Sequence, residues 1–164
     1  MNPTIIQAIG FVALGFIIVS FQNNKRSTLL ALMLTSVSLF VVHFILLGAL
    51  TGALMNSIEV GVLVVAYQKE SKAWAQKKWW PYVFALLFVI IGIVIYTRPI
   101  DFLPIVAQIF GTIGVWQKKP RTIRFIMLVP RPLWFIYNFI VGSYAGMLTE
   151  VFIFISVAVG IVRF

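Results

Sequence analysis

Apolar runs of membrane-spanning length follow one another along almost the whole chain. A helix needs about 20 residues to cross the hydrocarbon core of a bilayer. Seven runs of that order can be marked: Thr4–Gln22, Ser27–Leu47, Leu50–Tyr67, Trp79–Thr97, Pro99–Trp116, Thr122–Gly142 and Ala145–Arg163. Only 10% of the 164 residues are charged and the mean hydropathy is +1.05. This composition excludes an ordinary soluble domain and predicts an all-α integral membrane protein with seven transmembrane helices.

Glycine-containing turns separate two pairs of these runs, at Gly48 to Gly52 and at Gly142 to Gly146. Merging the runs on either side of each turn gives five spans, and this alternative stays open. A run of about forty apolar residues with paired glycines at its centre fits a helical hairpin better. The four glycines are interpreted as packing residues. Three prolines are expected to interrupt the fifth and sixth runs: Pro104, Pro130 and Pro132.

Basic residues favour the seven-span count, because cytoplasmic loops are enriched in Lys and Arg. Eleven of the 13 basic residues then fall on one side of the membrane: Lys25, Arg26, Lys69, Lys72, Lys77, Lys78, Lys118, Lys119, Arg121, Arg124 and Arg163. The other side receives only Arg98, while Arg131 lies inside a span. Merging either hairpin would remove this asymmetry. We therefore expect the N-terminus outside and the C-terminus in the cytoplasm. The first run has its positive charges after it, so it is expected to remain as a helix.

The two ends of the chain repeat one another. QNNKR at residues 22–26 aligns with QKKPR at residues 117–121. HFILLGALTGALMN, which begins at His43, aligns with NFIVGSYAGMLTE, which begins at Asn138, if one residue is deleted. Asn56 then falls opposite Glu150.

An arrangement of three spans, one linker span and three more spans suits such a repeat. An odd number of helices leaves both copies pointing the same way across the membrane. The prediction is thus a 3+1+3 fold made of two parallel three-helix repeats. Its parts are the first three-helix repeat at residues 1–68, a cytoplasmic basic loop and linker helix at 69–98, and the second three-helix repeat at 99–164.

Through SFQNNKR and the two repeated stretches, the chain resembles the YgjV family of bacterial inner membrane proteins over nearly its whole length. That resemblance implies an inner-membrane location and no established substrate. The 3+1+3 plan resembles the SWEET and PQ-loop (MtN3-like) transporters, in which an aromatic and an Asn of each repeat line a central pocket. The equivalents here are Phe40 with Asn56, and Trp134 with Glu150. The chain lacks an adjacent Pro-Gln pair, and Glu150 replaces a neutral amide, so the resemblance implies the fold more strongly than a sugar substrate.

Polar and aromatic side chains inside the predicted spans are the candidate substrate-binding residues, because ionisable groups at such depths are costly and usually functional. They are Phe40, His43, Asn56, Glu59, Arg131, Trp134, Asn138 and Glu150. For the amides, the alternative is hydrogen bonding between helices. For Trp134, the alternative is plain helix packing.

Arg131 has two alternative interpretations. Its side chain leans toward the start of its helix and could reach the cytoplasmic surface. If it stays in the membrane, it needs an acidic partner. Glu150 leans outward from a position soon after Gly146, so Glu59, which lies deeper, is the expected partner.

Two functional classes fit these residues. The first is a small-solute transporter that works by alternating access between two three-helix bundles, with Trp134 as a stacking platform and protonation of Glu150 coupled to solute loading. The second is a non-transporting membrane receptor or scaffold with the same fold. With one His, no Cys and no catalytic or metal-binding spacing, the sequence predicts no enzyme, no cofactor and no metal. The expected partners are the lipid bilayer and a small polar solute, and a homo-oligomer with further copies of the chain is left open. Nucleic acid is not expected.

Overall fold

Helices make up nearly all of residues 2–23, 25–69, 71–117 and 120–163, which the computed structural model describes. Eight α-helices and one short 3₁₀ turn follow one another in this part of the chain. They are α1 Pro3–Phe21, α2 Arg26–Leu46, α3 Leu50–Gln68, α4 Trp80–Ile95, η1 Pro99–Asp101, α5 Phe102–Val115, α6 Pro120–Leu128, α7 Pro130–Val141 and α8 Tyr144–Arg163. The predicted all-α class is confirmed.

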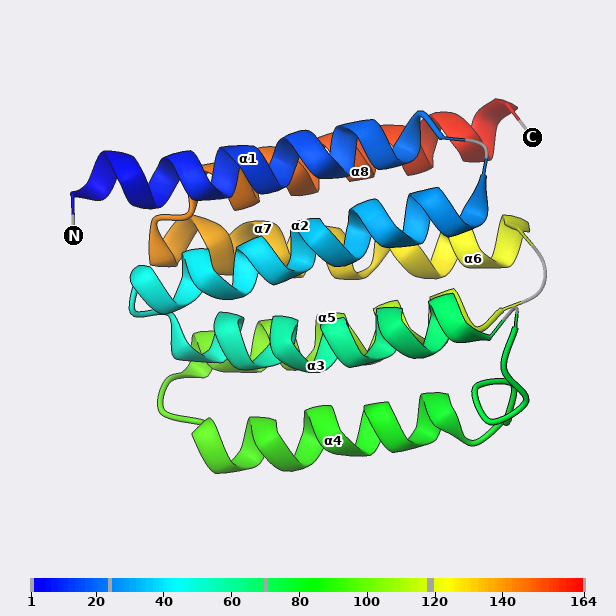
Figure 1. Cartoon of the computed structure of the whole chain (residues 1–164). Helices are drawn as coiled ribbons and strands as arrows, with labels where there is room; N and C mark the ends of the chain where they lie inside the picture. The colour runs from blue at the N-terminus through cyan, green and yellow to red at the C-terminus, as the bar shows by residue number, and fades with distance from the viewer. Residues whose placement is uncertain (1, 24, 70, 118–119, 164) are drawn as a thin grey trace.

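Figure 1 shows two layers of helices that run along a common direction. Helices α1, α2 and α3 form one layer, and α8, α7 with α6, and α5 form the other. Helix α1 packs on α8, and α3 packs on α5. The ring of Phe44 on α2 stacks on that of Trp134 on α7, with centroids 5.9 Å apart. Helix α4 lies at the edge of the bundle, where it packs on α3 and α5.

The two glycine hairpins are built in the same way. Gly48 and Gly142 end α2 and α7 in the left-handed region, with φ of 72° and 74°. One residue later, the amide of Ala49 donates to the Phe44 carbonyl and that of Ser143 donates to the Asn138 carbonyl, each at 2.9 Å. This bond from the second residue beyond the helix belongs to the Schellman motif, which favours glycine at the left-handed position. Two separate helices therefore meet at each turn, and the merged alternative is wrong.

The turns also correct the register of the repeat. Because each turn bonds back by the same number of residues, Phe44 is the counterpart of Asn138, and no deletion is needed between Asn138 and the turn. The alignment of His43 with Asn138 is therefore wrong. That alignment was based on the Phe and Gly positions shared by the two stretches, and the backbone hydrogen bonds of the turns do not agree with it. The uninterrupted register keeps Phe40 opposite Trp134.

Of the three prolines, Pro130 interrupts a helix. The predicted span Thr122–Gly142 is divided at Val129 into α6 and α7. Pro130 has no N–H to donate and fits the first position of a helix, so α7 restarts there. Pro104 lies in the first turn of α5 and does not interrupt it, because helix starts leave their amides unpaired. The prediction for Pro104 is therefore wrong.

The outer surface suits a bilayer. Helices α1, α2 and α3 are long and apolar enough to cross a membrane by length and composition. Shorter apolar helical stretches cover Trp80–Ile95, Pro99–Gly114, Phe125–Val141 and Tyr144–Val159. Large apolar side chains point outward, and Ile93 and Val94 on α4 are 71% and 75% exposed. Such a surface is stable in lipid rather than in water.

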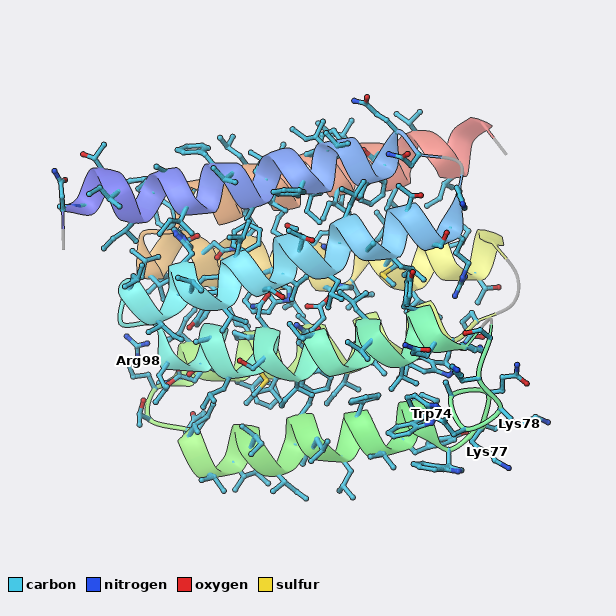
Figure 2. All side chains as sticks on the ribbon, viewed as in Figure 1. Trp74, Lys77, Lys78 and Arg98 are labelled. Carbon is cyan, nitrogen blue, oxygen red and sulfur yellow. The ribbon has the colours of Figure 1, made fainter. Side chains whose placement is uncertain are left out.

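Basic residues mark one end of the bundle. Lys77 and Lys78 project from the connection between α3 and α4, while Arg98 lies at the opposite end (Figure 2). In the same connection, the indole N–H of Trp80 donates to the carbonyl of Trp74 at 2.9 Å. In Figure 1 the α1–α2 connection lies at the same end as the α3–α4 connection, and both glycine turns lie at the opposite end, with Arg98. Lys118 and Lys119, which belong to the same prediction, lie outside the described residues. We refer to the two ends as the lysine end and the Arg98 end.

Candidate functional site

A cavity of about 460 Å³ lies inside the bundle, with walls from all the α-helices except α4. Its lining residues nearest the Arg98 end are Phe44, Asn138 and Gly146, and those nearest the lysine end include Phe21 and Val157. The cavity therefore runs through the middle of the bundle and reaches the last turn of α1 at the lysine end. Seven of the eight predicted binding residues line it: Phe40, Asn56, Glu59, Arg131, Trp134, Asn138 and Glu150.

Arg131 and Glu150 form an ion pair in the cavity wall. Arg131 Nη1 lies 2.9 Å from Glu150 Oε2, and the two side chains are 14% and 10% exposed. Arg131 Nε also donates to the Met127 carbonyl at 3.3 Å, across the break between α6 and α7. Glu59 was the expected partner, and this is wrong. Helix α8 packs directly on α7 and brings Glu150 to the level of Arg131, where a long arginine side chain closes the remaining distance. Since Arg131 is bonded inside the bundle, the snorkelling alternative is wrong as well.

Glu59 instead accepts a hydrogen bond from Gln108. Gln108 Nε2 on α5 lies 2.6 Å from Glu59 Oε2. Gln108 also lines the cavity and is only 4% exposed. It was not among the predicted binding residues. Its position four residues after Pro104, like that of Gln7 after Pro3, is a sequence signal that could have identified it.

Aromatic rings cover the wall of the cavity toward the Arg98 end. Trp134 stacks on Phe44, and Phe40 also stacks on Phe44 with centroids 6.0 Å apart. Trp134 and Phe40 are 6% and 7% exposed and both line the cavity. One face of the Trp134 ring is thus occupied by Phe44, and its edge meets Tyr137 at 5.6 Å.

The side-chain amides of Asn56 and Asn138, on opposite walls of the cavity, differ in their hydrogen bonding. Asn56 Nδ2 donates to the Gly52 carbonyl of its own helix at 2.8 Å, which leaves Oδ1 as an acceptor. Asn138 Oδ1 is buried without a hydrogen-bond partner in the described structure. A Cβ atom on Gly146 would approach this Oδ1 to 2.5 Å, so only glycine fits beside it. Buried polar atoms are rarely left unpaired, so this oxygen is an unsatisfied acceptor beside Gly146.

His43 does not line the cavity. It is fully buried on the side of the Arg98 end, where Nδ1 lies 2.8 Å from the Ile6 carbonyl and Nε2 lies 2.9 Å from Ser143 Oγ. A carbonyl can only accept, so Nδ1 carries the proton and Nε2 accepts from the Ser143 hydroxyl. The prediction of His43 as a cavity residue is therefore wrong. Its side chain binds the first helix layer to the α7–α8 turn.

Tyr137 makes a contact between the layers that corresponds to the His43–Ser143 bond. The sequence analysis did not identify Tyr137 as a functional residue. Its hydroxyl oxygen accepts from the Gly52 amide at 2.8 Å. At the start of α8, Ser143 caps the Gly146 amide with its own hydroxyl at 3.2 Å. Ala49 occupies the equivalent cap of α3 and has no side-chain oxygen. Tyr137 supplies the missing acceptor from the other layer, a role that no pattern in the sequence signals.

Asp101 adds a third bond across this end of the protein. Its carboxylate is fully buried and accepts from the Thr51 hydroxyl at 2.9 Å. The Thr97 hydroxyl and the Arg98 amide also donate to it, each at 2.9 Å. Burial alone would raise the pKa of this carboxyl, but the hydrogen bonds from Thr51, Thr97 and the Arg98 backbone outweigh it and lower the pKa below its ordinary value. The start of α3 is thereby bound to the α4–α5 connection.

The lining of the cavity resembles that of small-molecule sites. Within the described ranges, no three His, Asp or Glu side chains gather closely enough to hold a metal ion. The chain also has no cysteine. Apolar walls with a few directed polar groups are typical of small-molecule sites.

Comparison with known proteins identifies relatives by sequence alone, since no solved structure matches the chain. It is 26% identical over 161 residues to Inner membrane protein YgjV of Escherichia coli (strain K12), an alignment that covers 96% of this chain and 83% of that protein. A family model described as Bacterial inner membrane protein, Imp-YgjV, matches residues 4–164. The chain therefore belongs to the YgjV family of bacterial inner membrane proteins.

Proposed function

We propose that the protein is a transporter for a small solute in the bacterial inner membrane and that it works by alternating access. The observation that carries this proposal is a cavity shared by two helix layers that are hydrogen-bonded to one another at the Arg98 end. The bonds of His43 to Ser143 and of Tyr137 to Gly52 hold the layers together at the Arg98 end. Breaking them while closing the lysine end would expose the same cavity to the other side of the membrane.

The proposal includes seven crossings in a 3+1+3 order. Helices α1 to α3 form one half, α4 is the linker, and α5 to α8 form the other half, with α6 and α7 together crossing once. The matching glycine turns at Gly48 and Gly142 and the edge position of α4 support this order. So does the resemblance to SWEET and PQ-loop transporters. The excess of basic residues at the lysine end supports a cytoplasmic position for that end and an external N-terminus.

Reporter fusions test the orientation. A fusion after Gln68 should read cytoplasmic, and a fusion after Thr97 should read external. Identical readings at the two positions would remove α4 as a crossing helix and with it the 3+1+3 order.

Cysteine labelling tests alternating access, and the chain is suited to it because it has no native cysteine. Ser156→Cys faces the cavity toward the lysine end, and Thr51→Cys lies at the Arg98 end. A membrane-impermeant maleimide should label Ser156→Cys from the cytoplasmic side. Thr51→Cys should be labelled from outside, and more slowly when solute is absent.

The control is Ser71→Cys, because Ser71 is exposed in the connection between α3 and α4 and its hydroxyl donates to the nearby Gln68 carbonyl. Its labelling should not respond to solute. Solutes for this assay come from a thermal-stability screen of the purified protein with sugars, nucleosides, amino acids and organic cations. If every solute that stabilises the protein leaves the labelling of both Ser156→Cys and Thr51→Cys unchanged, the protein is a receptor or scaffold and not a transporter.

A further inference from the structure

The ionisable groups that line the cavity do not balance. They are Glu59, Arg131 and Glu150. The guanidinium of Arg131 is bonded to Glu150 at 2.9 Å. Glu59 has the neutral amide of Gln108 as its hydrogen-bond partner, and its Oε1 has no partner among the described residues. With both carboxylates ionised, the cavity therefore carries one uncompensated negative charge.

No other helix that packs on α3 supplies the missing positive charge. Helix α5 contributes Gln108, and α4 has no ionisable side chain other than the exposed Tyr82. On α2 the ionisable residues are Arg26, at its first residue, and His43, which is bonded to Ile6 and Ser143. Arg131 and Glu150 face Glu59 from α7 and α8 and act on it together as an ion pair. An isolated carboxylate in such surroundings must bind either a proton or a cation.

The amide oxygens of Asn56 and Asn138, which both line the cavity, have no hydrogen-bond partner among the described residues. Asn56 lies one turn before Glu59 on the same face of α3, and its Oδ1 is left free by the bond of its Nδ2 to Gly52. Asn138 Oδ1 on the opposite wall is buried and has no partner in the described structure. The hydroxyls of Thr149 and Ser156 already donate to carbonyls of their own helix. A ligand that matches these atoms has to donate hydrogen bonds.

We propose that the cavity binds a small organic monocation, an ammonium group on a largely apolar body, with Glu59 as its counter-ion in competition with a proton. The aromatic faces of Phe40 and Trp134 suit the cation and its apolar body, because aromatic rings attract ammonium groups. This inference rests on the proposed function, since it names the solute class of the same cavity. The sequence analysis linked protonation of Glu150 to solute loading. We assign this role to Glu59 instead, because Arg131 neutralises Glu150.

Equilibrium binding to the purified full-length protein in detergent tests the proposal. The probes are benzylamine, a cation at neutral pH, and benzyl alcohol, which has the same shape and no charge. At about pH 7.5, benzylamine should bind about tenfold or more tightly than benzyl alcohol, because the carboxylate attracts only the cation. Binding of benzylamine should weaken toward about pH 5, as a proton replaces it on Glu59, while binding of benzyl alcohol should not change. Equal affinities for the two probes in the wild type would overturn the proposal without any variant.

Two variants assign the charge. Glu59→Gln keeps the side-chain shape and an oxygen for Gln108, and should reduce benzylamine binding to that of benzyl alcohol with no pH dependence. Asp101→Asn removes a buried carboxylate that does not line the cavity, and should preserve both benzylamine binding and its pH dependence. Benzylamine binding that is kept in Glu59→Gln with its pH dependence unchanged would refute the proposal.

Uptake into proteoliposomes separates this inference from the proposed function. If benzylamine binds through Glu59 but neither it nor any other stabilising solute is taken up, transport is refuted and the cation site stands. If other solutes are taken up but benzylamine does not bind, the cation site is refuted and transport stands.

Discussion

His43 on α2 and Tyr137 on α7 are counterparts that each reach into the opposite helix layer. His43 accepts from Ser143 Oγ at 2.9 Å, and Tyr137 accepts from the Gly52 amide at 2.8 Å. Both side chains are fully buried. Each bonds near the start of the last helix of the other half. The contact that closes the Arg98 end is thus made twice, with different chemistry on the two sides.

Removing the Tyr137 hydroxyl should weaken this end. Tyr137→Phe leaves the Gly52 amide buried without an acceptor, which costs about 1–3 kcal/mol. Thermal unfolding of the purified protein should therefore shift to lower temperature. Tyr82→Phe is the matched control, because Tyr82 is 76% exposed. Equal melting temperatures for Tyr137→Phe and the wild type would show that the Gly52 amide finds another acceptor.

The ion pair gives a second prediction. Arg131→Leu strands the Glu150 carboxylate and should destabilise the protein by about 3–5 kcal/mol. Arg131→Leu combined with Glu150→Gln should recover much of this loss, whereas Arg131→Leu combined with Glu59→Gln should recover less. Denaturant unfolding of the three variants measures the difference. Better recovery with Glu59→Gln would mean that Glu59 is the main partner of Arg131.

Asp101 predicts a specific dependence on pH. Its pKa is lower in the folded protein than the ordinary 3.8. The carboxylate therefore stabilises the fold fully above the unfolded value, and this contribution is lost as the pH falls through the folded pKa. Thermal unfolding below about pH 4 should show a smaller loss of stability in Asp101→Asn than in the wild type.

Thr51→Val provides the control for this pH dependence, because it removes one of the donors that lower the pKa of Asp101 while keeping the shape of the side chain. Its loss of stability should be smaller than that of the wild type and should be complete at a higher pH, because its folded pKa lies closer to the unfolded value. Parallel pH curves for the wild type and Asp101→Asn would exclude Asp101 as the source.

The glycines are of two kinds. Some are required by a left-handed backbone angle, and others by the close approach of neighbouring atoms. Gly142→Ala should cost about 1 kcal/mol or more because φ is +74°, although no atom lies within 4 Å of the new Cβ. Gly146→Ala should cost more, because the new Cβ meets Asn138 and Ser143 at 2.5 Å. Gly15→Ala, with open space and an ordinary helical φ, should leave stability unchanged or raise it. Equal effects of all three substitutions on unfolding would contradict this assignment.

The glycine pairs also show how far sequence reasoning reached. Their position at the centre of long apolar runs predicted hairpins, and the structure confirms two turns of the same type. Their shared interpretation as packing residues was only half correct. Gly48 and Gly142 serve the turn, whereas Gly52 and Gly146 permit close packing. A glycine letter is the same in both cases, so only the backbone angle and the neighbouring atoms distinguish them.

Hydropathy, turn residues and the order of charges were enough to establish an all-helical membrane protein, its two hairpins and seven of the residues that line its cavity. These features depend on local sequence, because a helix forms and inserts according to its own apolar length. The tertiary structure decided three further features. It pairs Arg131 with Glu150, it bonds Gln108 to Glu59, and it places His43 outside the cavity. Each depends on how two helices are rotated and shifted against one another. From their depth in the membrane, both Glu59 and Glu150 could have paired with Arg131, and helix packing decided that Glu150 does.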